Sequence, residues 1–418
     1  MRVTTVFRRL LGIQKVRVID VVVYTSAKAI HVAVERASKR LTCSRCGYRS
    51  SGGSYDSHER LWRHLDLGAW EIYLRGQVRR FRCRRCELVV TERVPWADPG
   101  SVFTRDFENV VAYLAQQTNK SAIARLMGVA WPTVGNIIER TVKRHALPLH
   151  TRRLLRIGID EVSYRKGHRY LTLVADHVAG HIVWGAEGRS GATLAGFFDA
   201  IGEEACRQLE VVTVDMCEAY LTVIRRKAPQ AKVVIDPFHV VKLANAAVDE
   251  VRRSQVRALR GMAGATDLKK TRWILLRKPT DLLVGEYARL SVLAKVNRPL
   301  YRAYLLKESL RGIYDLEPAA AKKQLKAWLA WASRSKLKPF VKFARTVRRY
   351  QDGILAAIQY GISNARLEGL NSKVRLLSHR AFGFHSPEAL LALIALCCSG
   401  IQVPLHIDDH PRIDPHLM

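Results

Sequence analysis

The sequence lacks any apolar segment long enough to span a membrane. None of its hydrophobic runs reaches the roughly 18 residues that a transmembrane helix requires. The first ten residues, MRVTTVFRRL, also lack the apolar core of a secretory signal peptide. These two absences argue against a membrane or secreted protein, so we expect a cytoplasmic one.

Acidic residues are scarce. The 418 residues include 37 Asp and Glu against 69 Lys and Arg, which gives a formal net charge of +32 that is spread over the whole length. Such an excess is typical of proteins that bind nucleic acid, although charge alone does not separate DNA from RNA or from an acidic membrane. With 48% hydrophobic residues the chain is not disordered, and its length allows two to four domains.

Only eight cysteines are present, and four of them form two CxxC pairs, Cys43/Cys46 and Cys83/Cys86, which are 36 residues apart. Four thiolates are the ligand set of a tetrahedral structural zinc ion, so we predict a zinc ribbon. In a chain this basic, we expect residues 1–100 to form a DNA-binding domain that contains this ribbon and a β-hairpin. Reduced thiols without metal are the alternative, and His58 or His64 between the pairs could replace a cysteine ligand. We expect the other cysteines to be core thiols: Cys206, Cys217, Cys397 and Cys398.

Residues 16–36 alternate as in a β-hairpin, and residues 104–145 have a helical pattern. Within residues 101–150, the stretch NKSAIARLMGVAWPTVGNIIER has the build of a helix-turn-helix. We expect Ser121 to cap its first helix, Gly128 to form the turn and Pro132 to open the second helix. This arrangement turns three side chains outward, toward a DNA groove or, in an ordinary helical hairpin, toward solvent: Thr133, Asn136 and Arg140.

Residues 151–240 change to short β runs. Three consecutive strands, followed by alternating helices and strands, predict a mixed sheet with helices packed on it. Residues 241–350 are rich in Arg, Lys, Leu and Ala with helical spacing, so we predict an all-helical insertion. We expect residues 351–400 to pack back on the sheet as its second part and residues 401–418 to form a loosely held tail.

Three carboxylates are placed to hold metal ions. Asp160 and Asp215 end apolar runs that predict buried strands, and Glu368 lies in a helical stretch far downstream. Two Mg²⁺ or Mn²⁺ ions bridged by Asp160, with Asp215 on one and Glu368 on the other, could activate a hydroxyl group against a phosphodiester. Taken singly, each residue could equally cap a turn or lie on the surface.

Further residues near the expected sheet have open interpretations. Asp236 and His239 could support the metal site or contact phosphate, or could cap and pack a helix. We expect Glu161 to face away from Asp160, because neighbouring residues of a strand point to opposite faces. Three basic side chains beside the sheet face either a phosphate backbone or solvent: Lys166, His168 and Arg189.

Several motifs, in this order, resemble the bacterial insertion-sequence transposases of the ISL type (family three). Besides the CxxC pairs, these are GIDEVSYRKGHRYLTLVAD, EGRSGATLAGFF, VTVDM, DPFHVVKLAN and SNARLEGLNSKVRLLSHRAFGF. The resemblance implies a multidomain α+β protein with a zinc ribbon, a helix-turn-helix and an RNase H-like mixed α/β catalytic domain interrupted by the helical insertion. It places a DDE triad on Asp160, Asp215 and Glu368, with Asp236 and His239 matching a D-x-x-H signature.

The resemblance also implies an activity and partners. We expect a transposase that binds the terminal inverted repeats of its element in the nucleoid of a bacterial cell and catalyses strand cleavage and transfer into target DNA. One Zn²⁺ and two Mg²⁺ or Mn²⁺ ions are the expected cofactors, and a homodimer or higher homo-oligomer is expected on DNA. Two alternatives remain: an RNase H-like nuclease that does not join strands, and a transposase-derived DNA-binding regulator.

Overall fold

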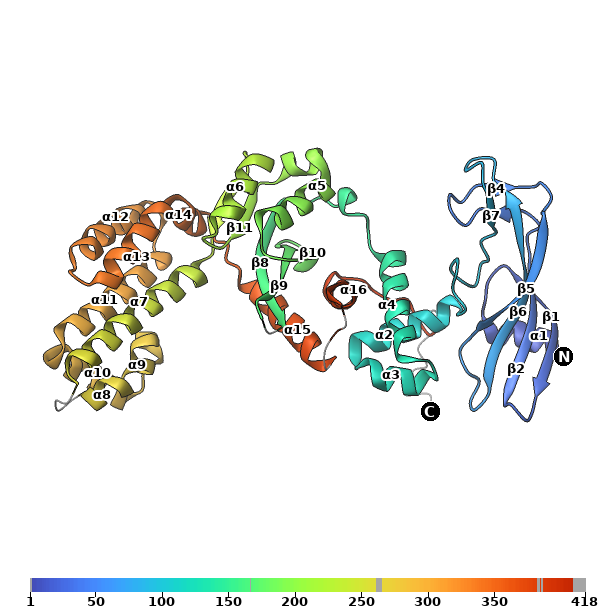
Figure 1. Cartoon of the computed structure of the whole chain (residues 1–418), viewed down its shortest axis with the longest axis horizontal. Coiled ribbons are helices and arrows are strands. Elements are labelled where there is room, and N and C mark those ends of the chain that lie inside the picture. Colours follow the sequence, from blue (N-terminus) through green and yellow to red (C-terminus); the bar gives the residue numbers. More distant parts are fainter. Residues whose placement is uncertain (1, 166, 261–264, 382–383, 385, 409–418) are drawn as a thin grey trace, which may run out of the picture. The chain divides into compact units, whose positions relative to one another are not determined.

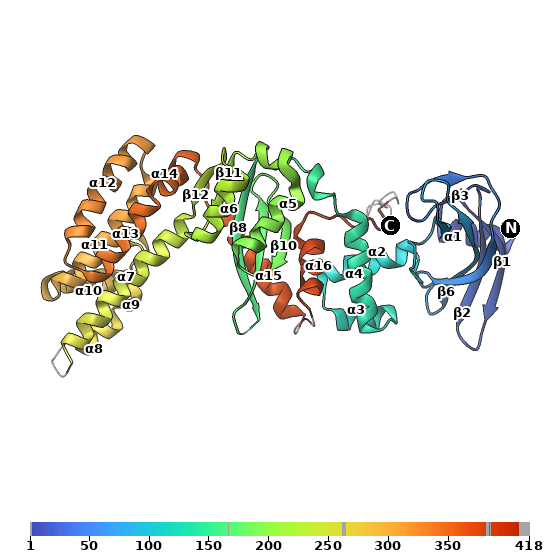
Figure 2. The same ribbon diagram turned by 45° about the horizontal axis from the view of Figure 1, so that its top comes forward.

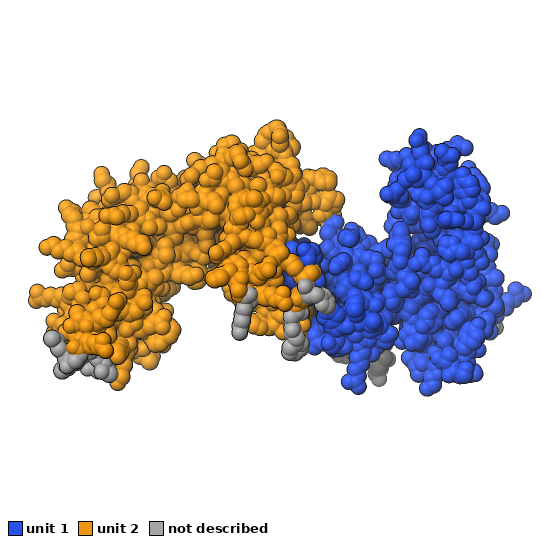
Figure 3. All heavy atoms as spheres, in the orientation of Figure 1, with its two compact units in different colours: residues 1–146, 388–418 blue, residues 147–387 orange. Residues whose placement is uncertain are grey.

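The structure, a computed structural model, describes residues 2–165, 167–260, 265–381, 384 and 386–408. Two compact units make up the chain (Figure 3). Unit 1 consists of residues 1–146 together with 388–418, and unit 2 consists of residues 147–387. The basic, proline-containing stretch of residues 147–156 lies at the start of unit 2.

Unit 1 joins a β-sheet region to a group of helices (Figure 1). Its elements are α1 (Val3–Leu11), β1 (Val16–Tyr24), β2 (Ala29–Arg36), β3 (Leu41–Thr42), β4 (Arg49–Ser50), β5 (Asp56–Arg63), β6 (Glu71–Arg82), β7 (Val89–Thr91), α2 (Arg105–Gln117), α3 (Lys120–Met127), α4 (Trp131–His145) and α16 (Pro387–Cys398).

The larger sheet of unit 1 has the strand order β1-β2-β6-β5, and β7 pairs with the far end of β6. The hairpin predicted over residues 16–36 is confirmed as the antiparallel pair β1–β2, whereas β2 and β6 are parallel. Trp62, Leu74 and Val32 are buried at its core. Sequence reasoning missed α1, which packs on β1 and buries Leu11, because only nine residues carry its helical pattern.

The helices α2, α3 and α4 confirm the helical pattern of residues 104–145. Gly128 ends α3 in the left-handed conformation at φ 62°, which a residue without a Cβ adopts at little cost. Val134 and Ile137 of α4 are fully buried. The predicted cap was wrong, because Asn119 rather than Ser121 accepts a hydrogen bond from the Ala122 N–H at the start of α3.

Helix α16 departs from the expected domain plan. We expected the whole of residues 351–400 to pack on the sheet of unit 2, but residues from 388 onward belong to unit 1. There the Gln116 side chain of α2 donates hydrogen bonds to the carbonyl oxygens of Leu396 and Ile401. The apolar pattern of α16 is typical of a buried helix, but such a pattern does not predict which hydrophobic core the helix packs against. Of the predicted tail 401–418, residues 409–418 lie outside the described residues.

Unit 2 contains the second large sheet and most of the helices. Its elements are η1 (Leu149–Thr151), β8 (Arg156–Arg165), β9 (Arg169–Asp176), β10 (His181–Glu187), α5 (Gly191–Gln208), β11 (Val211–Val214), α6 (Glu218–Lys227), β12 (Lys232–Ile235), α7 (Pro237–Ala258), α8 (Ala265–Lys270), α9 (Arg272–Leu276), η2 (Pro279–Asp281), α10 (Val284–Val296), α11 (Arg298–Gly312), η3 (Ile313–Asp315), α12 (Pro318–Arg334), α13 (Lys338–Arg349), α14 (Gln351–Tyr360) and α15 (Ala365–Arg380).

The mixed sheet predicted for unit 2 is confirmed. Its strand order is β10-β9-β8-β11-β12, in which the first three strands are antiparallel and β11 and β12 run parallel to β8. Connections between parallel strands need a crossover, and here α5 and α6 lie between β10, β11 and β12 in the chain. The carboxyl ends of β8, β11 and β12 therefore point the same way.

Among the described residues from 237 to 381, every regular element is helical, which agrees with the predicted composition of residues 241–350. Helix α7 starts at the end of β12 and runs away from the sheet into this helical part (Figure 2). One hydrophobic cluster extends from the sheet, including Ile159, through α7 to Trp328 of α12. The chain then returns: α14 packs on β12, and α15 packs on β8.

Candidate active site and metal centres

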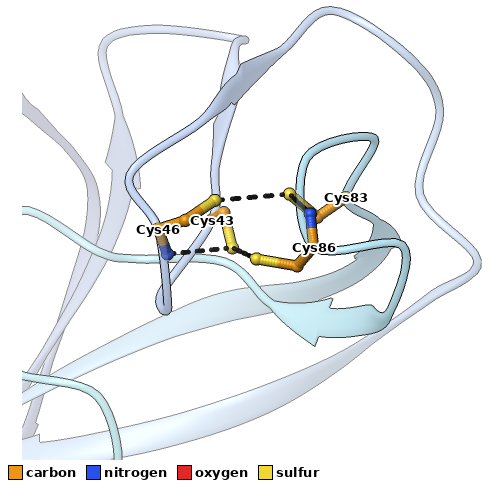
Figure 4. A group of neighbouring side chains, drawn as sticks. All are labelled: Cys43, Cys46, Cys83 and Cys86. Atoms are coloured by element: carbon orange, nitrogen blue, oxygen red, sulfur yellow. Dashed lines mark hydrogen bonds between the residues drawn. The ribbon is translucent and has the colours of Figure 1, made fainter.

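The four cysteines of the CxxC pairs converge in unit 1, as predicted (Figure 4). Each pair sits on a tight turn that closes through a backbone hydrogen bond, from Gly47 N to Cys43 O at 3.1 Å and from Glu87 N to Cys83 O at 2.8 Å. Gly47 and Glu87 both adopt positive φ. The two turns are therefore built alike, and each presents two sulfurs to the other.

The sulfur geometry fits zinc. The Sγ atoms of Cys43 and Cys86 are 3.9 Å apart, and those of Cys46 and Cys83 are 3.6 Å apart. A tetrahedron with Zn–S bonds of about 2.3 Å has edges of about 3.8 Å. The backbone hydrogen bond at Tyr48 lowers the pKa of the Cys46 thiol to about 7, so one thiolate forms near neutral pH. The donor set and spacing thus match a structural zinc site.

Neither histidine between the two turns joins this group. His58 is exposed on β5, whereas His64 is buried with its Nδ1 2.8 Å from the Thr104 hydroxyl. Burial lowers the pKa of His64 to about 4, so this imidazole is neutral under ordinary conditions. Its role is to hold Thr104, the residue that caps α2. The alternative of a histidine ligand is therefore wrong in this structure.

The aspartates predicted for the second site lie on adjacent strands of unit 2. Asp215 directly follows β11 and Asp236 directly follows β12. Asp160 lies within β8, which continues to Arg165 because it stays paired with β9, although its pairing with β11 is described only as far as Gly158. The expectation that Asp160 ends a strand is thus wrong, yet it sits where the parallel part of the sheet ends.

Asp160, Asp215 and His239 each offer a ligand atom, and these atoms all lie within 4.8 Å of one another. His239, on the first turn of α7, places its Nδ1 2.8 Å from Asp215 Oδ2. The other oxygen, Asp215 Oδ1, is buried and accepts no hydrogen bond from any described residue. Hard oxygen donors and an imidazole suit a divalent cation, and an unpartnered buried carboxylate oxygen is a feature that a cation would satisfy.

The pKa values follow from this crowding. Burial, reinforced by the negative charge of Asp215, raises the pKa of Asp160 above its ordinary value. Burial alone would lower the pKa of His239, but the hydrogen bond and charge of Asp215 outweigh it, so the pKa of His239 is raised. Two carboxylates that are held together in a poorly hydrated place repel each other, which is the condition that a bound cation relieves.

Asp236 has a different position. It is 1% exposed and caps α7 by accepting a hydrogen bond from the Phe238 N–H. The same oxygen accepts a bond from the backbone N–H of Asn364, which precedes α15. Its second oxygen lies 3.8 Å from His239 Nε2. Asp236 therefore ties the starts of α7 and α15 together, which agrees with the capping interpretation.

Helix α15 is fixed over the site by two buried amides that sequence reasoning missed. The Asn371 side chain donates a hydrogen bond of 2.5 Å to Asp160 Oδ2, and Asn364 Oδ1 accepts one from the Thr213 hydroxyl on β11. The motif LEGLN held a signal for Asn371, because a residue three positions after Glu368 shares its helical face.

Glu368 lies on α15 one turn before Asn371 and is half-buried. Its carboxylate is not part of the group formed by Asp160, Asp215 and His239. The structure thus brings two of the three predicted triad residues together with His239, and it places the third on the helix that contacts Asp160.

A hollow of about 400 Å³ adjoins Asp215 and His239. Glu161, Arg189 and Lys242 also line it. Sequence reasoning set Glu161 aside because it alternates with Asp160, but Asp215 lies beyond the end of its strand and is not confined to the face of Asp160. The hollow therefore combines carboxylates with two cations, a combination suited to a phosphodiester and its metal ions.

Comparison with known sequences identifies the family. A model of the ISL3 group, described as "Transposase", matches residues 157–394, which is more than half of the chain. Two more models match: "Helix-turn-helix domain of transposase family ISL3" over residues 92–142, and "zinc-finger of transposase IS204/IS1001/IS1096/IS1165" over residues 39–86. The chain belongs to the ISL3 family of transposases. The family predicted from the sequence motifs is thereby confirmed, together with the zinc ribbon, the helix-turn-helix and the expectation of an enzyme.

Curated relatives agree with this assignment. The chain is 37% identical over 449 residues to the transposase for insertion sequence element IS1557 of Mycobacterium tuberculosis, covering 99% of this chain and 100% of the relative. It is 28% identical over 376 residues to the transposase for insertion sequence element IS1001 of Bordetella parapertussis, covering 89% of this chain and 92% of the relative. The similarity thus extends over 92% or more of the length of both relatives.

Of the outward residues predicted on the second helix of the helix-turn-helix, only Asn136 is exposed. Thr133 lines a hollow of about 350 Å³ that Tyr73 of β6 also lines. The prediction that Arg140 points outward was wrong, because its Nη2 lies 2.7 Å from an oxygen of Glu108 on α2. Glu108 is fully buried and needs cationic partners, which Arg140 and Arg144 supply.

Two of the basic residues predicted beside the sheet, His168 and Arg189, lie next to the Tyr170 ring. Lys166 lies outside the described residues, and His168 is exposed in the β8–β9 turn. Arg189 lines the hollow beside Asp215, with its guanidinium 4.5 Å from the centre of the Tyr170 ring. Among the described residues, no helix is both long and apolar enough to cross a membrane.

Proposed function

We propose that the chain binds the terminal inverted repeats of its insertion sequence and catalyses DNA strand cleavage and strand transfer, in the cytoplasm of a bacterial cell. The observation that carries this proposal is the convergence of Asp160, Asp215 and His239 at the end of the parallel strands, beneath the helix that bears Glu368. The strand order β10-β9-β8-β11-β12, with three antiparallel strands and two parallel ones, supports an RNase H-like fold. The helical residues between Asp236 and Glu368 form its insertion.

Asp160, Asp215 and Glu368 would hold two divalent cations, Mg²⁺ or Mn²⁺, with Asp160 on both. When bound, such ions activate a water molecule or a 3′-hydroxyl group and stabilise the leaving oxygen of an in-line displacement. His239 orients Asp215 through its 2.8 Å contact. Asp236 and Asn371 fix the helix that carries Glu368. The cysteine centre would hold one Zn²⁺.

The chemistry has two steps. In cleavage, a water oxygen forms a bond to phosphorus, the bond to the 3′-oxygen breaks, and that oxygen leaves as a protonated 3′-hydroxyl at the element end. In transfer, this hydroxyl attacks a target phosphodiester and displaces another 3′-oxygen, so the number of phosphodiester bonds is conserved. No covalent bond to the protein is required. Joining two ends needs two active sites, so we propose a homodimer or higher oligomer on DNA.

The test uses the full chain, a duplex that carries the element end, a target duplex and Mg²⁺. We expect Asp160→Asn to lower the cleavage rate about 10³-fold or more, because it weakens the site that holds both ions. End binding should stay nearly unchanged. Asp176→Asn is the matched control. Asp176 lies at the end of β9, accepts a hydrogen bond from the Val178 N–H and is not part of the group formed by Asp160, Asp215 and His239.

Two outcomes would replace the proposal. Cleavage without any joined product would make the chain a nuclease of the same fold. Specific end binding without cleavage by the unaltered chain would make it a DNA-binding regulator.

A further inference from the structure

Unit 1 contains a large basic hollow that none of the predicted sites includes. Its volume is about 910 Å³, and it lies among the start of β1, the end of β2, the β3–β4 hairpin and the segment that leads into α2. Six of its lining residues are Lys or Arg, and Asp106 is the single acidic one. We name this feature, lined by Lys15, Arg40, Arg49 and Arg93 among others, the basic hollow.

Two of the six cations already have structural partners. Arg36 is nearly buried and forms an ion pair of 2.7 Å with the fully buried Glu92. Arg105 donates a hydrogen bond of 2.8 Å to Asp98 and another to the Pro95 carbonyl oxygen. These arginines hold the segments together and are not available to a ligand.

The other four cations are exposed: Lys15, Arg40, Arg49 and Arg93. Within the described part of the chain, none of their side chains has a hydrogen bond or an ion pair. Four like charges around one hollow repel each other, and a stable fold has no need to gather them there. Their arrangement therefore favours a polyanionic ligand.

The segments that carry these cations are tied to one another. The Arg93 N–H donates to Thr42 O at 2.7 Å, and Thr42 pairs with Arg49 across the β3–β4 hairpin. The Ala37 N–H donates to Lys15 O at 2.9 Å. The neighbouring bridge between Cys43 and Glu92 links the hollow directly to the first cysteine turn. The cations are thus held on a prepared surface beside the zinc site.

We propose that the basic hollow binds the sugar-phosphate backbone of double-stranded DNA beside the four cysteines of the zinc ribbon. This inference rests on the proposed function, because it adds a contact with the same DNA. A backbone is favoured over a single phosphate because the cations come from four separate segments rather than converging on one point. A backbone ligand carries no base information, so the hollow anchors any sequence equally.

The test measures the dissociation constants of the full chain for an end-bearing duplex and for a scrambled duplex of equal length over a range of salt concentrations. We expect Arg40→Ala combined with Arg93→Ala to weaken both complexes by the same factor. The slope of log K against log salt should fall by about 0.9 for each lost phosphate contact, hence by about 1.8. Lys322→Ala with Lys326→Ala, which removes two exposed charges from α12, is the control and should leave the slope unchanged.

An unchanged slope in the double variant, with zinc content and thermal unfolding equal to those of the unaltered chain, would overturn the inference. If the same substitutions weakened the binding of an acidic polypeptide but not the binding of DNA, the inference would also be overturned. The hollow would then be a protein-docking site. Failure of the proposed function is distinguishable, because it appears as missing cleavage or missing end preference in the unaltered chain while the salt slope remains measurable.

Discussion

The cysteine centre and the carboxylate site are assembled in opposite ways. Each CxxC turn orients its own two sulfurs through local backbone bonds, so the centre needs only two short segments to meet. The carboxylate site draws on β8, β11, α7 and α15, whose contributing residues extend from Asp160 to Asn371. The cysteine centre therefore depends on a local sequence motif, whereas the carboxylate site forms only when the whole of unit 2 is folded. Damage to the first should change folding, and damage to the second should change chemistry.

The largest effect is expected from Cys43→Ser. Binding of a structural zinc ion contributes on the order of 10 kcal/mol to the folding of its module, and a hydroxyl group is a poor replacement for a thiolate. We expect the variant to lose its zinc, to expose residues 1–146 to protease and to lose DNA affinity. Zinc content per chain and limited proteolysis measure this.

The matched control for that variant is Cys206→Ser, which alters a buried thiol of unit 2 whose Sγ lies 3.6 Å from Phe198 O. It should keep one zinc per chain. If the Cys43→Ser variant retained its zinc, the conclusion that the four cysteines of the two CxxC turns hold the ion would be contradicted.

A smaller effect is expected from Asn371→Ala at the carboxylate site. The substitution removes the donor to Asp160 Oδ2 and one attachment of the helix that bears Glu368. Loss of such a supporting hydrogen bond typically costs about 10- to 100-fold in metal affinity or activity. We expect the cleavage rate to fall by that factor while end binding and zinc content stay constant.

Ser372→Ala changes the next, exposed residue of α15 and should leave cleavage unchanged. If Asn371→Ala cleaved at the normal rate at every metal concentration, the amide would be a packing residue without influence on the site.

The smallest effect is expected from Gly158→Ala, which tests how closely the sheet and the segment before α15 approach. A Cβ at this position would lie 2.8 Å from His177 Nε2, 2.9 Å from Thr213 Oγ1 and 3.0 Å from Asn364 Oδ1. Such overpacking typically costs about 1–3 kcal/mol of unfolding free energy. We expect a lower midpoint of chemical unfolding and, because Asn364 is displaced, slower cleavage.

Gly369→Ala provides the comparison, because nothing lies within 4 Å of a Cβ there and alanine favours a helix by about 1 kcal/mol. It should be neutral or stabilising. If both variants were equally stable, the segment that contains Asn364 would be able to shift and make room for a Cβ at position 158.

Sequence reasoning succeeded where spacing encodes geometry. Three features could be predicted because each depends on neighbours within a few residues: the CxxC pairs, the glycine turn at Gly128 and the position of Asp215 at the end of a strand. It failed for Arg140, because the buried partner Glu108 lies 32 positions earlier in the chain and only packing brings the two together. The assignment of α16 failed for the same reason.

By itself, the sequence determined the family, the candidate cysteine ligands and the candidate carboxylates, because these are carried by residue type and local spacing. Only the tertiary structure decided that His239 contacts Asp215, that Asn371 and Asn364 fasten the helix bearing Glu368, and that four exposed cations surround one hollow in unit 1. These relations depend on distances between segments that are far apart in the chain, and those distances are set by the burial of shared cores rather than by any local pattern.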